Sequence, residues 1–207
     1  MPRCVAVGTY ETALRGVLLG YKEKGRHRLA GPLGTLLATA VAALAPRGTP
    51  VALVPVPSTA AAARERHGDH MRRLAAQAVR RLRAAGWDAG VSHQLEALPR
   101  PDSTSLSVAG RRAAAEDSLR IRRARIGVRW RAESRRGTLV IVDDIVTTGA
   151  TLAAATGRLE EAKMQVAGAA VLAATPLRRS SAVGFDVLPP GGTEKVERRG
   201  SGIPNEG

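Results

Sequence analysis

Apolar residues along the chain occur in two spacings, which predict strands alternating with helices. Short continuous apolar runs occupy residues 51–58, 139–146 and 166–175, and such runs are typical of strands buried on both faces of a parallel sheet. Another strand is expected near Val91, and residues 118–130 hold two short strand-like pieces separated by arginines. The pattern therefore predicts central strands spread over the length of the chain.

Other segments repeat apolar residues every three or four positions, which predicts amphipathic helices. One helix is expected after Thr9, which can cap it, and another over residues 29–44. Asp69 is expected to cap a third helix, which ends at Gly86 because glycine adopts the left-handed conformation that closes many helices. A fourth helix follows Gly149.

Strands that alternate with helices predict an α/β fold, with a parallel twisted sheet flanked by helices. In such sheets, ligands bind beyond the carboxyl ends of the strands. Residues 1–188 are expected to form a single domain, and residues 189–207 a disordered C-terminal tail. Residues 99–117 are small and polar, which predicts a long mobile loop leading into a short helix.

The composition favours a cytoplasmic globular protein. A content of 44% apolar residues in 207 is enough for a core, and the chain lacks both a membrane-spanning apolar run and the residue order of a secretory signal. The single cysteine, Cys4, excludes an internal disulfide and a cysteine-rich metal site. The net charge of +14 would ordinarily suggest a nucleic-acid partner, but only 2% of the residues are aromatic, so the stacking platforms of single-strand binders are missing.

The segment LVIVDDIVTTGAT, residues 139–151, combines groups that suit a sugar phosphate. Its turn offers consecutive backbone N–H groups, threonine hydroxyls and a glycine, and the start of the following helix favours an anion. Asp143 and Asp144 accept hydrogen bonds as carboxylates, so they suit paired hydroxyls or a cation. The alternative is a threonine-rich turn and helix cap with two solvated acids, but the match over consecutive positions favours the sugar-phosphate interpretation.

This segment resembles the phosphoribosyl pyrophosphate (PRPP) binding motif of type I phosphoribosyltransferases over its whole length. The resemblance implies a fold like that of this family. It also implies that Asp143 and Asp144 hold the ribose hydroxyls, as the catalytic pair. The loop that would hold the 5′-phosphate of PRPP then consists of Thr147, Thr148, Gly149, Ala150 and Thr151.

Residues 10 to about 175 resemble more specifically the ComF (competence protein F) branch, on the segments YKEKGRHRLAGPLGTLLA and VALVPVPSTAAAARERHGDHMRRLA. This resemblance implies a pyrophosphate-binding loop from Ser58 to Arg66. Its contacts would be Ser58, Arg64 and Arg66, with Lys22 as an additional cation. The four-cysteine zinc module that precedes this domain in typical members is expected to be missing.

The expected mobile loop both matches and departs from the ComF pattern. Arg100 and Arg111 match it, whereas Ser103 stands where the family usually has glutamine and Ala114 where it usually has asparagine. No residue is directly assigned as a metal ligand. His67 and His70 are interpreted as a loop residue and a residue of the first helical turn, because no third ligand stands nearby at suitable spacing.

Two functions are open from the sequence. The first is transfer of a phosphoribosyl group from PRPP to an unknown acceptor with release of pyrophosphate, in which Mg²⁺ bridges pyrophosphate and ribose oxygens. The second is a catalytically weak PRPP- or nucleotide-sensing protein, with DNA or competence and recombination proteins as partners. This second function is suggested by the altered loop together with eight arginines in residues 120–136. Such an arginine-rich segment is also typical of a solvated strand pair and linker. No membrane partner is expected, and a homodimer is compatible with both functions.

Overall fold

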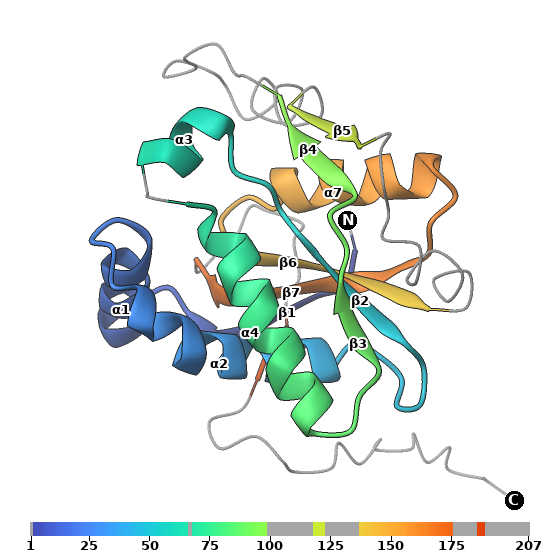
Figure 1. The fold of residues 1–207 in the computed structure, drawn as a ribbon, viewed down its shortest axis with the longest axis horizontal. Helices are drawn as coiled ribbons and strands as arrows, with labels where there is room; N and C mark the ends of the chain where they lie inside the picture. Colours follow the sequence, from blue (N-terminus) through green and yellow to red (C-terminus); the bar gives the residue numbers. More distant parts are fainter. Residues whose placement is uncertain (1, 66–67, 99–117, 123–136, 176–185, 189–207) are drawn as a thin grey trace, which may run out of the picture.

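The computed structural model describes residues 2–65, 68–98, 118–122, 137–175 and 186–188. Within these ranges the main sheet has six strands in the order β3-β2-β6-β7-β1-β8, and every neighbouring pair is parallel (Figure 1). The strands are β1 (Cys4–Thr9), β2 (Val51–Pro55), β3 (Ala89–Val91), β6 (Thr138–Val146), β7 (Val166–Ala174) and β8 (Asp186–Val187). The predicted α/β fold with a parallel sheet flanked by helices is therefore confirmed.

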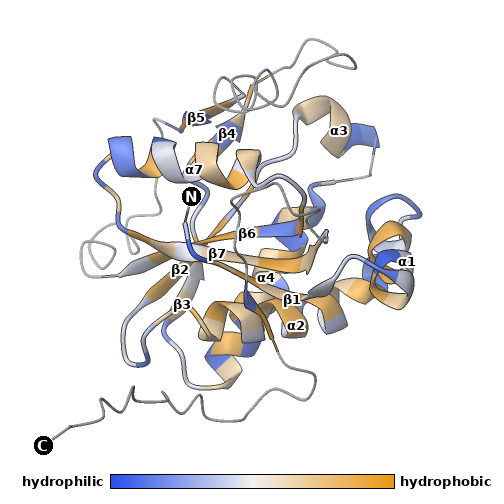
Figure 2. Cartoon of the chain, turned by 180° about the vertical axis from the view of Figure 1, so that it is seen from behind, coloured by the Kyte–Doolittle hydropathy of each residue, from blue (hydrophilic) through white to orange (hydrophobic). Residues whose placement is uncertain are grey.

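Helices cover both faces of this sheet. Side chains of α1 (Thr12–Lys22), α2 (Ala30–Ala42) and α4 (His70–Ala84) pack on one face, together with the short 3-10 helix η1 (His27–Leu29). Helix α7 (Ala150–Glu161) packs on the other face. Figure 2 colours much of the sheet and of α2 as hydrophobic, as expected for a sheet buried between two helical layers. The carboxyl-terminal rim of the sheet is left for a site.

Helices α2 and α4 pack against each other at Gly34. A Cβ atom added to this glycine would clash with the Cβ of Gln77 on α4, so only a residue without a side chain allows this approach. Gly31, one turn earlier on α2, has open space around the same position. The close contact fixes α4, and α4 carries part of the site described below.

A second, two-stranded antiparallel sheet stands above the rim. It consists of β4 (Leu95–Ala97) and β5 (Leu119–Ile121), and the backbone N–H of Leu98 donates to the carbonyl of Ser118 at 2.8 Å. Arg158 of α7 donates from Nε to the carbonyl of Leu119 at 3.2 Å, which ties this small sheet to the main body. Leu95 and Leu119 are buried in the same cluster as α7.

The two predicted helix caps, at Asp69 and Thr9, have different outcomes in the structure. Asp69 caps α4, since its Oδ1 accepts the N–H of Arg72 at 3.1 Å, and the chain leaves this helix at Gly86 with φ +82°. The prediction that Thr9 caps a helix is wrong. Thr9 is the last residue of β1, whose pairing with β7 uses its backbone, and α1 begins later, after Glu11.

Other differences concern elements that the pattern did not indicate. Cys4–Thr9 is a full strand, β1, between β7 and β8, and part of the expected pyrophosphate loop is the short helix α3 (Ala60–Glu65). The predicted mobile loop at 99–117, most of the arginine-rich segment and the tail at 189–207 lie outside the described residues. In the part of the chain that is described, no helix is both long and apolar enough to cross a membrane.

Candidate functional site

The site begins where β2 and β6 end side by side. Pro55 pairs with Val142, and the backbone N–H of Val56 donates to the carbonyl of Val142 at 3.0 Å. The loop that follows β2 therefore leaves the sheet beside Asp143 and Asp144, which β6 carries. This is the rim at which parallel sheets place their ligands.

A cavity of about 250 Å³ opens at this rim. Its lining comes from the end of α1, the loop after β2, the start of α4, the acidic end of β6, the first turn of α7 and the small β4–β5 sheet. The polar residues that line it are Lys22, Ser58, Thr59, His70, Ser118, Asp143 and Thr151. Segments distant in the sequence thus converge on one pocket.

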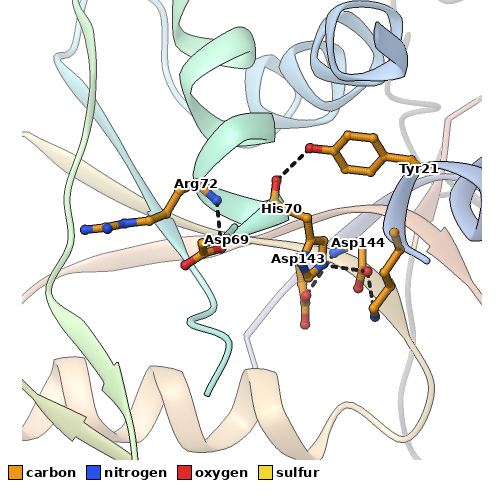
Figure 3. A network of polar contacts seen from close by, with 7 residues as sticks. Tyr21, Asp69, His70, Arg72, Asp143 and Asp144 are labelled. Carbon is orange, nitrogen blue, oxygen red and sulfur yellow. Dashed lines mark hydrogen bonds and ion pairs between the residues drawn. The ribbon is translucent and has the colours of Figure 1, made fainter. Parts of the chain in front are cut away.

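Asp144 is held by two nitrogen groups. Its Oδ2 atom lies 2.8 Å from Nζ of Lys22 and 3.1 Å from Nε2 of His70, and the residue is only 5% exposed (Figure 3). Burial alone would raise the pKa of this carboxyl, but the hydrogen bond from His70 and the charge of Lys22 outweigh it and hold the pKa well below its ordinary value. Asp144 is therefore an ionised, anchored carboxylate.

Asp143 has the opposite character. It is half-buried, it lines the cavity, and its Oδ1 accepts the backbone N–H of Asp144 at 2.9 Å. Loss of solvent, and then the negative charge of Asp144, raise the pKa of Asp143 well above its ordinary value. Asp143 is the acid that faces the cavity, and it keeps its proton to higher pH than a solvated aspartate.

His70 opens α4, as predicted for a first-turn residue, but its contact with Asp144 was not predicted. The ring is buried, the His70 carbonyl accepts the hydroxyl of Tyr21 at 2.9 Å, and the two rings meet edge-on with centroids 6.4 Å apart. Among the described residues, Nδ1 of His70 has no hydrogen-bond partner although it is buried. Because His70 and Asp144 are 74 positions apart in the sequence, no short-range spacing pattern indicates this contact.

The threonine-rich loop connects β6 to α7. Thr147 and Thr148 are exposed, and Gly149, the N-cap of α7, has φ +73°. The first turn of α7 contains no acidic residue and receives no side-chain cap bond, although the N–H of Ala150 lies 3.5 Å from Oγ1 of Thr148. Helix starts of this kind attract anions through their free N–H groups. Of the predicted phosphate loop, Thr151 also lines the cavity.

The expected pyrophosphate contacts are only partly brought together. Ser58 lines the cavity, and so does Lys22, whose ammonium group is paired with Asp144. Arg64 is exposed on α3 and is not part of the cavity lining. Arg66 lies outside the described residues.

Four further residues named from the sequence, all in the predicted mobile loop, lie outside the described part of the chain. They are Arg100, Ser103, Arg111 and Ala114. The residues that flank this segment, Leu98 and Ser118, both line the cavity. The loop thus leaves the described structure, and returns to it, at the pocket.

A second cavity, of about 400 Å³, lies on the other side of the loop that contains Pro57 and Ser58. It is bordered by Arg72 and His93, whose Nε and Nδ1 atoms are 3.4 Å apart. Burial, and then the charge of Arg72, lower the pKa of His93. This cavity contains neither of the two rim acids among its lining residues.

The donors at the first cavity allow a magnesium ion that arrives with a phosphorylated ligand. Magnesium prefers hard oxygen ligands and is commonly held by one or two carboxylates plus substrate phosphates and water. Asp143 and the hydroxyl of Ser58 are oxygen donors of this kind. In the described residues no group of three or more His, Cys, Asp and Glu side chains could hold a metal by itself.

Comparisons with known proteins bear on the same region of the chain. A solved hypoxanthine phosphoribosyltransferase from Staphylococcus aureus is similar with 15% identity and a TM-score of 0.39, over 80% of this chain and 72% of that one. No curated protein matches the chain. The family model of the phosphoribosyl transferase domain matches residues 90–183, less than half of the chain. The matched segment contains both rim acids and the threonine-rich loop, so this part of the chain carries the sequence pattern of a phosphoribosyl transferase domain.

Proposed function

We propose that the protein is a PRPP-binding phosphoribosyltransferase that transfers the phosphoribosyl group to an acceptor and releases pyrophosphate. The observation that carries the proposal is the meeting of an acid pair with a threonine-rich helix start at one pocket, inside the segment that matches the phosphoribosyl transferase domain. A sugar phosphate needs both kinds of group, because its hydroxyls donate hydrogen bonds and its phosphate accepts them.

The rim suggests where each part of PRPP would bind. The 5′-phosphate would occupy the start of α7, where Thr147 and Thr148 are exposed and the first helical turn contains no acidic residue. The ribose hydroxyls would meet Asp143 and Asp144. The pyrophosphate would lie toward Ser58 and Lys22, with Arg64 or Arg66 as additional cations.

In the proposed reaction the bond between ribose C1 and the pyrophosphate oxygen breaks, and a bond from C1 to the acceptor forms. The bonding electrons leave with pyrophosphate, so positive charge develops on the ribose ring. The protein would act by holding the two reactants in line and by placing charge around them, and no nucleophilic side chain is required. Lys22, ion-paired with Asp144 at 2.8 Å, is near enough to the cavity to be shared with the leaving group.

Magnesium would supply charge neutralisation for the pyrophosphate group. Asp143 is the residue best placed to contact such an ion, because it faces the cavity and Asp144 is already paired with Lys22 and His70. Binding of a cation beside Asp143 would also favour loss of its proton.

We further propose that the protein belongs to the ComF branch, on the strength of the Pro-Val-Pro strand end, the Asp69-capped helix and the Lys22 segment. The alternative function in nucleic-acid binding receives less support. Of its arginines, Arg120 and Arg122 lie on or beside β5 and both pair with Glu96, at 3.0 and 3.9 Å. The remaining arginines lie outside the described residues.

The decisive experiment is a calorimetric titration of the protein with PRPP and magnesium, because it needs no knowledge of the acceptor. Binding is expected for the wild type, and Asp143→Asn is expected to weaken it at least tenfold, since a charged hydrogen bond contributes roughly 1.5–3 kcal/mol. The matched control is Asp186→Asn, an exposed acid on β8 whose partner among the described residues is Arg3; this variant is expected to leave binding unchanged. Absence of PRPP binding by the folded wild type would refute the proposal.

A further inference from the structure

We infer that His70 is a positioning residue for Asp144, which selects the oxygen of this carboxylate that receives a ribose hydroxyl. The inference rests on the proposed function, because it concerns the hydroxyl-bearing part of the same ligand. It adds a residue that neither the motif at 139–151 nor the family match includes, since His70 lies before residue 90.

The protein uses the two oxygens of Asp144 unequally. Lys22 and His70 both contact Oδ2, at 2.8 and 3.1 Å. Oδ1 makes no hydrogen bond to another described residue, and it is not among the fully buried side-chain atoms that lack a partner, so it keeps contact with solvent. One oxygen of Asp144 is thus occupied by the protein, and the other remains for a ligand.

Lys22 and His70, the two groups that contact Oδ2 of Asp144, differ in how rigidly they are held. Lys22 approaches on a long flexible stem and is 25% exposed in its side chain, so it can follow a moving carboxylate. The His70 ring cannot do so. It is buried, it meets the ring of Tyr21 edge-on, and its backbone is held by the Tyr21 hydroxyl and by the cap of α4 at Asp69.

The Nδ1 atom of His70 has no hydrogen-bond partner among the described residues. A carboxylate only accepts hydrogen bonds, so Nε2 must carry the proton that is shared with Asp144. In the neutral ring Nδ1 is then an acceptor, and within the described residues it is buried with no donor. A buried acceptor without a partner destabilises a fold, and a purely structural position would be better filled by an apolar side chain. The contact with Asp144 accounts for a polar ring at this place.

The consequence concerns only ligands that carry hydroxyls. Without the His70 hydrogen bond, Asp144 would be free to turn and to offer both oxygens to Lys22. Its Oδ1 would then no longer be held in one orientation, and a ribose hydroxyl would lose its acceptor. Pyrophosphate, which carries no such hydroxyl, would bind as before.

The test compares two ligands on the same variants, by calorimetry with PRPP and with inorganic pyrophosphate, each with magnesium. His70→Leu keeps the volume and removes the hydrogen bond, and it is expected to weaken PRPP binding roughly tenfold while changing pyrophosphate binding less than about twofold. His70→Gln, whose amide can still donate to Asp144, is expected to stay within about threefold of the wild type for PRPP. Thermal unfolding of both variants checks that they remain folded.

A double-mutant cycle separates a positioning role from direct contact. If His70 acts through Asp144, adding His70→Leu to Asp144→Asn causes no further loss of PRPP affinity. An additive loss, an equal weakening of both ligands, or unchanged PRPP binding in His70→Leu overturns the inference while the proposed function stands. A wild type that binds pyrophosphate but not PRPP overturns the proposed function, and the inference falls with it. Should His70→Leu not fold, His70→Ala replaces it in the same cycle.

Discussion

Asp143 and Asp144 are adjacent in the sequence, yet they point to opposite faces of β6, and their pKa values are shifted in opposite directions. The alternation of side chains along a strand turns Asp144 toward α1 and α4, where Lys22 and His70 bind it. Asp143 turns toward the face of Cys4 and α7, where no lysine or histidine of the described residues forms an ion pair with it, and burial, followed by the neighbouring carboxylate, opposes its ionisation. The two acids are therefore not interchangeable.

Replacing Asp144 with asparagine is expected to destabilise the protein at neutral pH by roughly 1–3 kcal/mol, because Lys22 and His70 lose the charge they bind. The pKa of Asp144 is lower in the folded than in the unfolded chain, so its contribution to stability is present above the ordinary value of 3.8 and is lost as the pH falls below it. Urea unfolding of the wild type and of Asp144→Asn, at pH 7 and below pH 4, measures the difference in their free energies of unfolding. A stability difference between wild type and variant that does not shrink in acid would contradict the assignment.

The neighbouring substitution, Asp143→Asn, is expected to have the opposite effect on stability. The folded-state pKa of Asp143 is raised, so the stability linked to its proton is present below 3.8 and is lost as the pH rises through the raised value. Asparagine stays neutral and still accepts the N–H of Asp144, so the variant should be more stable than the wild type at pH 8. The same urea series detects this, and a destabilised Asp143→Asn at pH 8 would contradict a raised pKa for this carboxyl.

The Cys4 thiol is expected to be unreactive in the folded protein. It is 1% exposed on β1, and burial, followed by the charge of Asp143, raises its pKa to about 11. Reaction with a thiol reagent at pH 8 should therefore be slow until urea unfolds the chain, with Cys4→Ser as the blank. Because the folded pKa is raised, this thiol contributes stability that is fully present below pH 9.0 and declines as the pH rises toward 11. Rapid labelling without urea would indicate that β1 separates from a neighbouring strand in the folded protein.

Gly149 is expected to be required for the phosphate loop. Its φ of +73° is unfavourable for a residue with a Cβ atom, so Gly149→Ala should lose about 1 kcal/mol of stability and bind PRPP more weakly. Gly157→Ala is the matched control within the same helix, since nothing lies within 4 Å of a Cβ atom added there. Alanine favours a helix interior over glycine by about 0.8–1 kcal/mol, so this control should be as stable as the wild type or more so. Equal thermal unfolding of the two variants would exclude the backbone explanation.

Gly34→Ala is expected to separate α2 from α4 and to destabilise the fold by roughly 1–3 kcal/mol, because the added methyl group clashes with Gln77. Gly31→Ala, one turn away on α2 with open space around it, is expected to be neutral or stabilising. Thermal unfolding compares them directly. Since α4 carries His70, the effect of Gly34→Ala on PRPP affinity would also report how far the site depends on this helix contact.

The sequence predicts helices and strands best where the spacing of apolar residues matches one type of element over its whole length. The strand at Val51–Pro55, the acidic strand at Thr138–Val146 and the helix capped by Asp69 were all predicted, because burial on both faces and capping leave local signals. The pattern did not identify β4, since three residues are too few for a period to show. The contact between His70 and Asp144 depends on how α4 packs across the sheet, which is a long-range property that no local spacing contains. The pairing of Lys22 with Asp144 was hidden for the same reason, although Lys22 itself was named.

The placement of β1 inside the sheet has a practical consequence for work on this protein. All six strands run in the same direction, so the beginning of β1 at Cys4 lies at the edge opposite the rim that holds the cavity. An affinity tag or fluorescent partner joined ahead of this strand would extend away from the pocket mouth. Surface immobilisation through such an N-terminal extension should therefore leave the cavity accessible to small molecules in solution.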